Sequence, residues 1–441
     1  MNKNFETLKG TYEYLPAEQT LREEIKRKLT EIFRIYGFSP AETPILCMYD
    51  LLASKYSADA DILNETYKLS DQGERALGLR YDLTICFSKL IATNGSIVMP
   101  FKRYEIGKVF RDGPVKLGRN REFTQCDVDI VGVKSIMQDA EFMNLTHDGF
   151  KNLGLDIEIR YNNRKLLTGL IQKIFGKLDA DITRKAIMLI DKLDKLTNDE
   201  LKAEFKKIDF DGEKVDELLQ VLSLSFDKIK EKYEADAEGI LKEGIDELSE
   251  LILYTKNTVA SEDMVFSPYL ARGIDIYTGT VWEIFLKNRN VNGHDFNVSL
   301  GGGGRYDHII TEFVGTGEEY PAIGMSFGLD VIYEILNKMH EGEVKSCVDL
   351  FIIPIGTGVD SFKLASGLRN EGLKVEIEKM DRRVKKSMNY ANKENIPFVV
   401  VIGEDEVKNG KIKLKDMQSG DEHEFGIGDY VSMKKIIENK N

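Results

Sequence analysis

The spacing of apolar residues along the chain changes three times. Residues 17–36 repeat apolar positions at helical spacing, which predicts an early helix. Short runs such as SIVMPFKRYEIGKVFR and CDVDIVGV predict β-strands up to about Tyr161. A Lys-, Glu- and Leu-rich stretch from Asn163 to Asn257 keeps helical periodicity, so we expect a helical insert with a solvated charged face. Strand-like, glycine-rich sequence returns from Met264 to about Gly328.

The last part of the chain alternates strands and helices. CVDLFIIPIG and PFVVVIGEDEV are typical of buried strands, and RRVKKSMNYANKENI predicts a basic helix that is stopped by Pro397. Asn409-Gly410 and Ser419-Gly420 predict the turns of a hairpin. This order predicts a compact α/β module with a mostly parallel sheet. We therefore expect four segments, with bounds 1–162, 163–257, 258–340 and 346–441.

The composition limits the partners and the compartment. A net charge of −13 over 441 residues excludes bulk attraction of nucleic acid, so any RNA must meet local basic patches such as Lys385, Lys386 and Lys393. The four cysteines form no CxxC motif and the five histidines no HExxH motif, so we assign no metal site. The start lacks an apolar signal core, and no apolar run reaches the roughly 18 residues of a membrane span. We expect a cytoplasmic protein without a membrane partner.

The stretch VFRDGPVKLGRNREFTQCDVDIVG has the strongest chemical signal. Arg111, Arg119 and Arg121 flank a Gly/Pro loop between two strand-like segments. A hairpin that brings several guanidinium groups to one surface suits a polyphosphate, because arginine binds phosphate oxygens in pairs. Phe123 is placed to stack on a base. A solvated hairpin with surface charges is the alternative.

The second half of this hairpin alternates polar acceptors. Gln125, Asp127 and Asp129 lie two residues apart, so a strand would point all three to one face. An amide and two carboxylates together suit a cationic ligand that donates hydrogen bonds.

Three further motifs suggest ligand contacts. In LGLRYDLT, we expect Asp82 and Thr84 to share a strand face with Arg80, although a salt-bridged edge strand explains this pattern equally well. Four glycines precede Tyr306 in SLGGGGRYDHII, and they indicate either close approach of the backbone to a ligand or a flexible turn. In PAIGMSFGLDVI, we expect two glycines on one helical face, open to a ligand or to close helix packing: Gly324 and Gly328.

Together these motifs resemble the class II aminoacyl-tRNA synthetases, and specifically the histidyl-tRNA synthetase family, over nearly the whole chain. YGFSPAETP is similar to the first class motif, which lies at a dimer interface, and residues 110–123 are similar to the second. LARGIDIYTGTVWE and GGGRYD resemble the two histidine-specific motifs, and VKKSMNYANKENIPFVVVIGEDE resembles the anticodon-binding domain. The resemblance implies an α+β catalytic core, an antiparallel sheet flanked by helices, with a helical insert and a C-terminal α/β anticodon-binding domain.

The resemblance also implies roles for individual residues. The substrates would be ATP with Mg²⁺, histidine and histidine tRNA, and the assembly a homodimer. Arg272 and Arg111 would stabilise charge at the α-phosphate, Arg119 would bind the γ-phosphate, and Phe123 would stack on adenine. Gly324 and Gly328 would belong to the ATP site. Histidine would be held through its α-amino group by Asp82, Thr84 and Gln125, beside Leu83, and through its imidazole by Asp129, near Ile276, Tyr277 and Tyr306.

The chain departs from the family pattern at three positions. Val331 stands where the third class motif has an arginine, Ile276 where a tyrosine is common, and Gly113 where a glutamate follows the second-motif arginine, with Asp112 beside it. These departures leave two other readings open. One is a paralogue that does not charge tRNA and serves as the histidine-sensing regulatory subunit of ATP phosphoribosyltransferase. The other is an RNA-binding or stress-sensing relic of the fold. Arg272 favours the synthetase over both.

Overall fold

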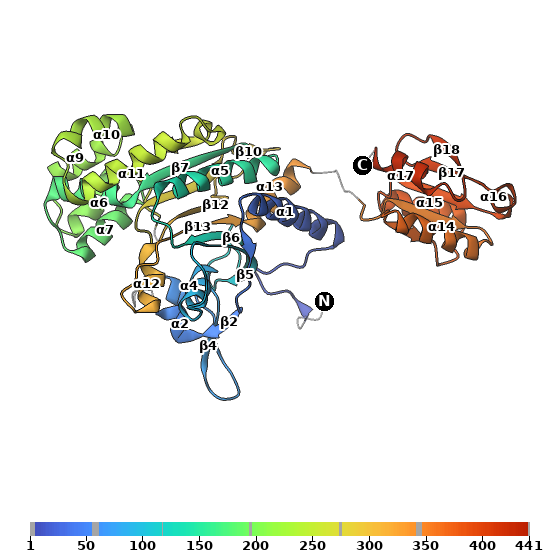
Figure 1. The fold of residues 1–441 in the computed structure, drawn as a ribbon, viewed down its shortest axis with the longest axis horizontal. Coiled ribbons are helices and arrows are strands. Elements are labelled where there is room, and N and C mark those ends of the chain that lie inside the picture. The colour runs from blue at the N-terminus through green and yellow to red at the C-terminus, as the bar shows by residue number, and fades with distance from the viewer. Residues whose placement is uncertain are drawn as a thin grey trace. The chain divides into compact units, whose positions relative to one another are not determined.

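Two compact units make up the chain. The computed structural model describes residues 5–54, 61–116, 118–193, 196–272, 276–340 and 346–439. The first unit comprises Met1–Glu13 and Arg22–Met339, and the second comprises Tyr14–Leu21 and His340–Asn441 (Figure 1).

A mostly antiparallel sheet of eight strands forms the centre of the first unit. The strand order is β1-β5-β6-β13-β12-β9-β7-β8, and the two edge pairs, β1 with β5 and β7 with β8, are parallel. The order places β6 beside β13, two strands that are far apart in the sequence. The strands are β1 (Ser39–Pro40), β5 (Phe101–Phe110), β6 (Glu122–Val131), β7 (Ile157–Asn163), β8 (Met264–Phe266), β9 (Thr280–Leu286), β12 (Gly301–Arg305) and β13 (Ala322–Gly328).

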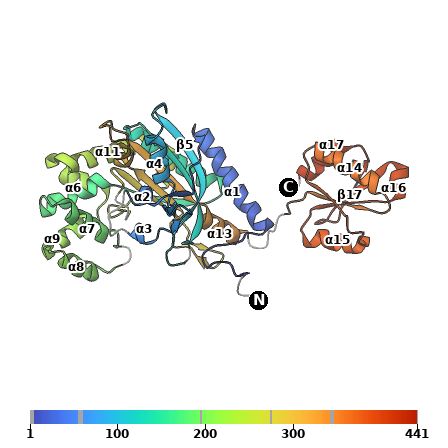
Figure 2. The ribbon, with the colours of Figure 1, turned by 90° about the horizontal axis from the view of Figure 1, so that it is seen from below.

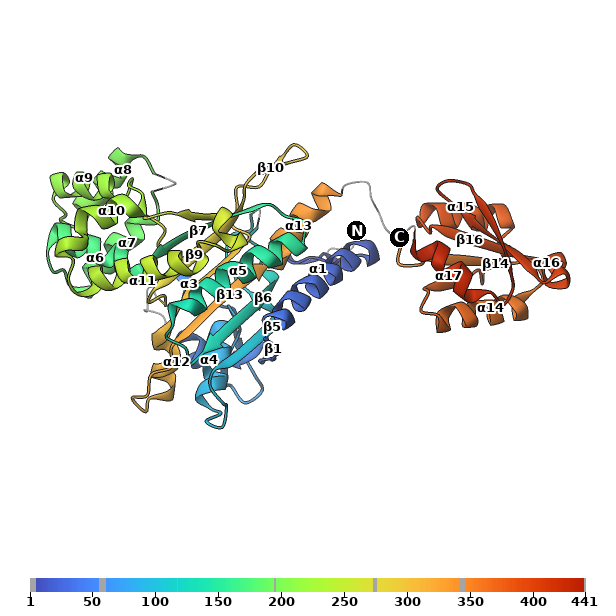
Figure 3. The same cartoon turned by 45° about the horizontal axis from the view of Figure 1, so that its top comes forward.

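Two long helices cover one face of this sheet. Helices α1 (Pro16–Ile35) and α5 (Ile136–Asn152) lie side by side over β5, β6 and β13 (Figure 3). Phe327 of β13 is buried between them, with ring centroids 5.6 Å from Phe33 and 5.1 Å from Phe150. Since side chains alternate along a strand, the residues next to Phe327 point to the opposite face of the sheet.

A small sheet and several short helices complete the core around that opposite face. The small sheet has the order β2-β4-β3. Helices α4 and α12 pack together through an apolar cluster that includes Phe87 and Ile310 (Figure 1). The elements are β2 (Leu46–Met48), α2 (Tyr49–Ala53), α3 (Asp61–Asn64), β3 (Lys68–Ser70), β4 (Ala76–Leu79), α4 (Thr84–Ala92), β10 (Asn290–Val291), β11 (His294–Asp295), α12 (Asp307–Val314) and α13 (Leu329–Met339).

The region predicted as a helical insert is helical from Arg164 to Thr255, apart from its connections (Figure 2). Helices α6 and α11 approach each other closely at Gly244, where a Cβ atom would overlap the backbone of Leu166. The separate status of 163–257 as a domain stays a prediction. The helices are α6 (Arg164–Phe175), α7 (Ala180–Ile190), α8 (Asn198–Lys207), α9 (Gly212–Val221), α10 (Phe226–Tyr233) and α11 (Gly239–Thr255), followed by a 3₁₀ turn (Val259–Glu262).

The second unit is an α/β module around a five-stranded sheet of order β15-β14-β16-β17-β18. Helices α14 and α17 share one apolar cluster, and α15 packs in another (Figure 2). The elements are β14 (Leu350–Pro354), α14 (Gly358–Asn370), β15 (Val375–Ile377), α15 (Val384–Lys393), β16 (Phe398–Ile402), α16 (Glu404–Asn409), β17 (Lys411–Asp416), β18 (Glu422–Gly426) and α17 (Tyr430–Glu438).

Three details of this unit differ from the sequence prediction. Strands β14, β15 and β16 are parallel, but β17 and β18 are antiparallel, so the sheet is mixed rather than mostly parallel. Asn409-Gly410 does not turn a hairpin, because Gly410 ends α16 in the left-handed conformation at φ +65°. Helix α15 ends at Lys393, before Pro397 is reached. Ser419-Gly420 does connect β17 to β18, as predicted.

Candidate active site

A cavity of about 100 Å³ lies on the face of the large sheet opposite α1 and α5. Strand β6, strand β13, the start of α4 and the segments on both sides of 273–275 enclose it. Residues 273–275 themselves, which the histidine-specific motif includes, lie outside the described residues. The cavity is lined by Tyr81, Asp82, Thr84, Arg111, Gln125, Asp127, Asp129, Arg272, Ile276, Tyr277, Gly302, Tyr306, Gly324, Met325 and Ser326.

Two glycines, Gly302 and Gly324, line the cavity. The four-glycine run is strand β12, in the middle of the sheet, and not a flexible turn. A Cβ atom on Gly302 would overlap the guanidinium of Arg272, and one on Gly304 would lie 2.5 Å from Cδ1 of Tyr277. On the neighbouring strand β13, a Cβ atom on Gly324 would overlap the carboxylate of Asp129. Glycine is required here because large polar side chains lie flat across the strands.

Strand β6 supplies acceptors, as its alternation predicted. Gln125 donates through Nε2 to Oγ of Ser326 at 3.0 Å, while its Oε1 is buried without a partner in the described part of the chain. Asp127 likewise has a buried Oδ1 for which the described residues supply no donor. Burial and the neighbouring Asp129 raise the pKa of Asp127 to about 8, against the attraction of Arg103. These unpaired oxygens suit a ligand that donates hydrogen bonds and carries positive charge.

Asp129 is held from two sides. Tyr306 donates its hydroxyl to Oδ1 at 2.5 Å, and the Nη2 nitrogen of Arg103 lies 2.8 Å from Oδ2. Arg103 also pairs with Glu105 at 3.1 Å and stacks on Phe87 at 4.3 Å from the ring centroid. Burial raises the pKa of the Asp129 carboxyl, and the charge of Arg103 opposes that shift. Sequence reasoning missed Arg103, because only the β5–β6 register, which pairs it with Asp129, places it there.

Two arginines bring positive charge to the cavity. Arg272 has the uncommon φ of +46°, and its Nη1 donates to the carbonyl of Trp282 at 3.0 Å. Burial opposes its charge, but Tyr277 and Glu283 raise the pKa of Arg272, so it stays a cation. The guanidinium of Arg111 lies between two rings, 4.2 Å from the centroid of Tyr81 and 4.8 Å from that of Phe123.

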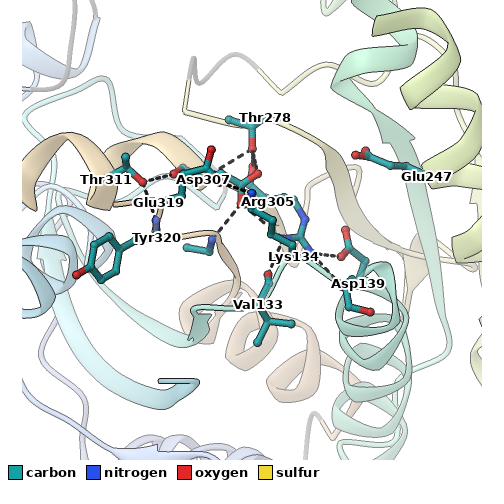
Figure 4. Close-up of polar contacts among 12 residues, drawn as sticks. Val133, Lys134, Asp139, Glu247, Thr278, Arg305, Asp307, Thr311, Glu319 and Tyr320 are labelled. Atoms are coloured by element: carbon teal, nitrogen blue, oxygen red, sulfur yellow. Dashed lines mark hydrogen bonds and ion pairs between the residues drawn. The ribbon is translucent and has the colours of Figure 1, made fainter. Parts of the chain in front are cut away.

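The segment that carries Tyr277 is anchored by a polar network (Figure 4). The Thr278 hydroxyl donates to Oδ2 of Asp307 at 2.8 Å, and the Thr278 N–H donates to the carbonyl of Arg305 at 2.7 Å. Arg305 in turn donates to the carbonyl of Val133 at 2.9 Å and forms a buried ion pair with Asp139. The arginine and aspartate of GGGGRYD therefore support the site without lining it.

Four predicted site residues do not line the cavity. Leu83 is fully buried at the N-cap of α4, and its role in binding histidine stays a prediction. Arg119 pairs with Glu65, Phe123 packs against Arg111, and Gly328 lies at the end of β13 beside the carbonyl of Leu300.

Two predictions about local structure are wrong. The segment with Gly324 and Gly328 is strand β13 rather than a helix, since its central position between β6 and β12 overrides the apparent helical spacing. Asp82 and Thr84 share no strand face, because β4 ends at Leu79 and Thr84 begins α4. Arg80 points away from the cavity and is buried against Glu105, at 2.9 Å.

Some lining residues carried no usable sequence signal. Tyr81 lies inside RYDLT, and Met325 and Ser326 lie inside the segment whose glycine spacing predicts a helix. A strand reading of that segment would have placed Ser326 on the same face as Gly324.

The structure shows the neighbours of the three residues that depart from the family pattern. Val331 is buried at the start of α13, where its Cγ2 lies 3.3 Å from the position of a Cβ atom on Gly118. Ile276 lines the cavity and packs against the apolar cluster that contains Phe87. Gly113 lies against the carboxylate of Glu65.

The described ranges contain neither a metal-binding cluster nor a membrane-spanning helix. No group of three or more His, Cys, Asp or Glu side chains in these ranges is placed to hold a metal ion. No helix in the part of the chain that the structure describes is long and apolar enough to cross a bilayer.

Family models match most of the chain. A model described as histidyl-tRNA synthetase matches residues 10–332, and one described as anticodon binding domain matches residues 349–437. The chain belongs to the histidyl-tRNA synthetase family. The family resemblance drawn from the motifs is thereby confirmed, as is the α+β core with a C-terminal anticodon-binding domain.

Relatives of known name match over nearly their full length. Histidine–tRNA ligase 1 of Bacillus cereus is 46% identical over 420 residues, which cover 94% of this chain and 96% of that protein. Histidine–tRNA ligase of Clostridium tetani is 33% identical over 445 residues, which cover 98% of each chain.

Solved structures show the same fold. The histidyl-tRNA synthetase of Nostoc sp. PCC 7120 has a TM-score of 0.84 at 28% identity, over 99% of this chain and 100% of that one. A Bacillus halodurans protein titled ATP phosphoribosyltransferase regulatory subunit/histidyl-tRNA synthetase has a TM-score of 0.76 at 21% identity, over 90% and 98%. At 21% identity this likeness shows the fold alone and does not distinguish between the two activities named for that protein.

Proposed function

We propose that this chain is a histidine–tRNA ligase, which activates histidine with ATP and transfers it to the 3′ end of histidine tRNA. One observation carries the proposal. One cavity is lined both by the acceptors of β6 and by two arginines, Arg111 and Arg272, so that it complements a cationic, hydrogen-bonding group as well as anionic groups.

Histidine binding follows from the acceptors. The α-ammonium group would be bound by Gln125 Oε1 and Asp127 Oδ1, which have no donor in the described structure, together with Asp82 and Thr84. Asp129, oriented by Tyr306, would accept the imidazole N–H. An apolar amino acid of similar size would leave this buried carboxylate unsatisfied, and such mismatches are the strongest source of substrate discrimination.

Activation would be carried out by positioning and charge stabilisation. A carboxylate oxygen of histidine attacks the α-phosphorus of ATP, the bond from that phosphorus to the bridging oxygen breaks, and pyrophosphate leaves. Arg272 and Arg111 stabilise the negative charge that develops on the α-phosphate. A fixed donor at such a place is worth about 3–4 kcal/mol of barrier lowering. Arg119 would bind the γ-phosphate and Phe123 would stack on adenine.

The proposed metal is Mg²⁺, carried by the substrate. The described residues offer no cluster of ligands, and Mg²⁺ is commonly bound through phosphate oxygens and water with few protein ligands. When bound, it would neutralise charge on the triphosphate. Gly324 and Gly328 remain proposed neighbours of the ATP site.

Transfer requires the tRNA. The terminal ribose hydroxyl attacks the acyl carbon of the histidyl-adenylate, and AMP leaves. The second unit would bind the anticodon region, and helix α15 exposes Lys385, Lys386 and Lys393 for phosphate contacts.

We also propose a homodimer in the cytoplasm. The small sheet exposes a row of apolar side chains, including Leu46, Met48 and Leu69, which are 50%, 48% and 44% exposed. Cross-strand pairing aligns Met48 and Leu69 with Leu77 on one face. Such a face suits a subunit interface. Met48→Glu should shift the sedimentation coefficient to that of a monomer, whereas an unchanged coefficient would place the interface elsewhere.

Histidine-dependent exchange of pyrophosphate into ATP tests the activity. The wild-type chain should exchange only with histidine present, and Arg272→Ala should abolish exchange while Arg75→Ala, an exposed arginine in the β3–β4 loop, should not. Charging of histidine tRNA then completes the test. Histidine binding without exchange would reject the proposal, and would favour a histidine sensor that binds ATP phosphoribosyltransferase.

A further inference from the structure

Glu65 lies outside the hairpin formed by β5 and β6 but contacts Arg119 in it, and also Tyr81, which stacks on Arg111. Glu65 follows α3, and its side chain is 14% exposed. Its Oε1 forms an ion pair with Nη2 of Arg119, and Tyr81 donates its hydroxyl to Oε2 at 3.3 Å. The ring of Tyr81 stacks on Arg111. The Glu65 carboxylate therefore contacts Arg119 directly and is connected to Arg111 through the ring of Tyr81.

The backbone strengthens this link. The N–H of Asp112 donates to the carbonyl of Glu65 at 2.7 Å. A Cβ atom on Gly113 would lie 2.7 Å from Oε1 and 2.8 Å from Cδ of Glu65. The carboxylate of Glu65 thus occupies the space in which a side chain at position 113 would begin. Glu65 can therefore hold this position only because residue 113 is a glycine.

We propose that Glu65 is a positioning residue that orients Arg119 for the polyphosphate of ATP. The inference rests on the proposed function, since it takes Arg119 to bind phosphate. Glu65 contacts the Nη2 nitrogen of Arg119, whose side chain is still 35% exposed. The guanidinium is thus held by the protein at one nitrogen while the side chain stays partly accessible, and a planar fork held in this way binds phosphate with little loss of entropy.

The test is the Glu65→Gln variant of the full chain in histidine-dependent pyrophosphate exchange. Removing the charge of one partner in a charge-assisted contact should raise the KM for ATP by about tenfold, while the KM for histidine changes less than about twofold. Glu122→Gln serves as the matched control, because Glu122 lies on the same hairpin but pairs with the exposed Lys108. A variant of Arg119 combined with Glu65→Gln should lose no more ATP affinity than the Arg119 variant alone.

The possible outcomes separate the two proposals. Absence of exchange in the wild-type chain would reject the proposed function. Exchange in the wild type with an unchanged KM for ATP in Glu65→Gln would reject the positioning role alone, and a lower KM would show that Glu65 competes with phosphate. Relocating the carboxylate should rescue the defect. Glu65→Ala combined with Gly113→Glu should recover part of the ATP affinity that Glu65→Ala loses, and no recovery would overturn the proposal.

Discussion

The hydroxyl of Tyr306 donates to Asp129 at 2.5 Å, on the carboxylate whose other oxygen lies 2.8 Å from Arg103. Asp129 is therefore fixed in place in a buried setting, where burial raises the pKa of its carboxyl and the charge of Arg103 opposes that shift. The pair Tyr306–Asp129 joins the second histidine-specific motif to strand β6, two segments that are 177 positions apart in the sequence.

Asp129→Asn should impair histidine binding much more than Tyr306→Phe. The first change removes one of the two carboxylates that pair with Arg103 and replaces the charged acceptor for the imidazole, which should raise the KM for histidine by about 100-fold. The second removes one neutral donor and should cost at most about tenfold. Pyrophosphate exchange at varied histidine measures both. Equal effects of the two variants would show that Asp129 serves the fold rather than the substrate.

Gly302→Ala should mimic the loss of Arg272. The added methyl group would overlap the Arg272 guanidinium and lie 2.6 Å from the carbonyl of Trp282, the partner of that guanidinium. Displacing a transition-state donor should lower kcat for exchange by about 100-fold or more. Gly95→Ala is the matched control, because nothing lies within 4 Å of its Cβ position. Full activity in Gly302→Ala would mean that Arg272 acts from another position.

Asp139→Asn should destabilise the first unit strongly. Asp139 and Arg305 form an ion pair in which the side chains are 0% and 4% exposed, and loss of one partner leaves a buried charge (Figure 4). The expected decrease in the free energy of unfolding is about 3–5 kcal/mol. Glu319→Gln breaks the exposed pair with Lys134 and should leave the unfolding midpoint nearly unchanged. Urea unfolding of the two variants, followed by circular dichroism, provides the comparison, and equal midpoints would contradict it.

The sequence predicted the elements of the site better than their arrangement. The alternation of Gln125, Asp127 and Asp129 required only the period of a strand, and the structure places all three on the cavity. Gly324 and Ser326 could not be placed in this way. Their segment has glycines at helical spacing, and only pairing with β6 and β12 makes it a strand. Long-range pairing of this kind is not encoded locally.

The contacts that support the site could not be predicted from the sequence for the same reason. Arg103 and Arg305 are ordinary charged residues in the sequence, and their importance depends on partners 26 and 166 positions away, Asp129 and Asp139. The position of Glu65 could not be predicted either, because its carboxylate fills space left by Gly113 in another segment.

Histidine binding should strengthen as the pH rises from about 7 to 8, if Asp127 binds the ammonium group. Burial, then the charge of Asp129, raises the pKa of Asp127 to about 8, with Arg103 opposing and Asp82 contributing to the shift. Below that pH the free carboxyl is mostly protonated, so binding a cation must first release a proton. Affinity should fall as the pH decreases, approaching tenfold per unit well below the pKa. Calorimetry in buffers of different ionisation enthalpy should detect the released proton at pH 7. Asp127→Asn should bind more weakly and lose this component of the profile. Titration of histidine itself affects the wild-type chain and Asp127→Asn equally. Parallel pH profiles of the two would therefore exclude Asp127 as the group that causes the pH dependence.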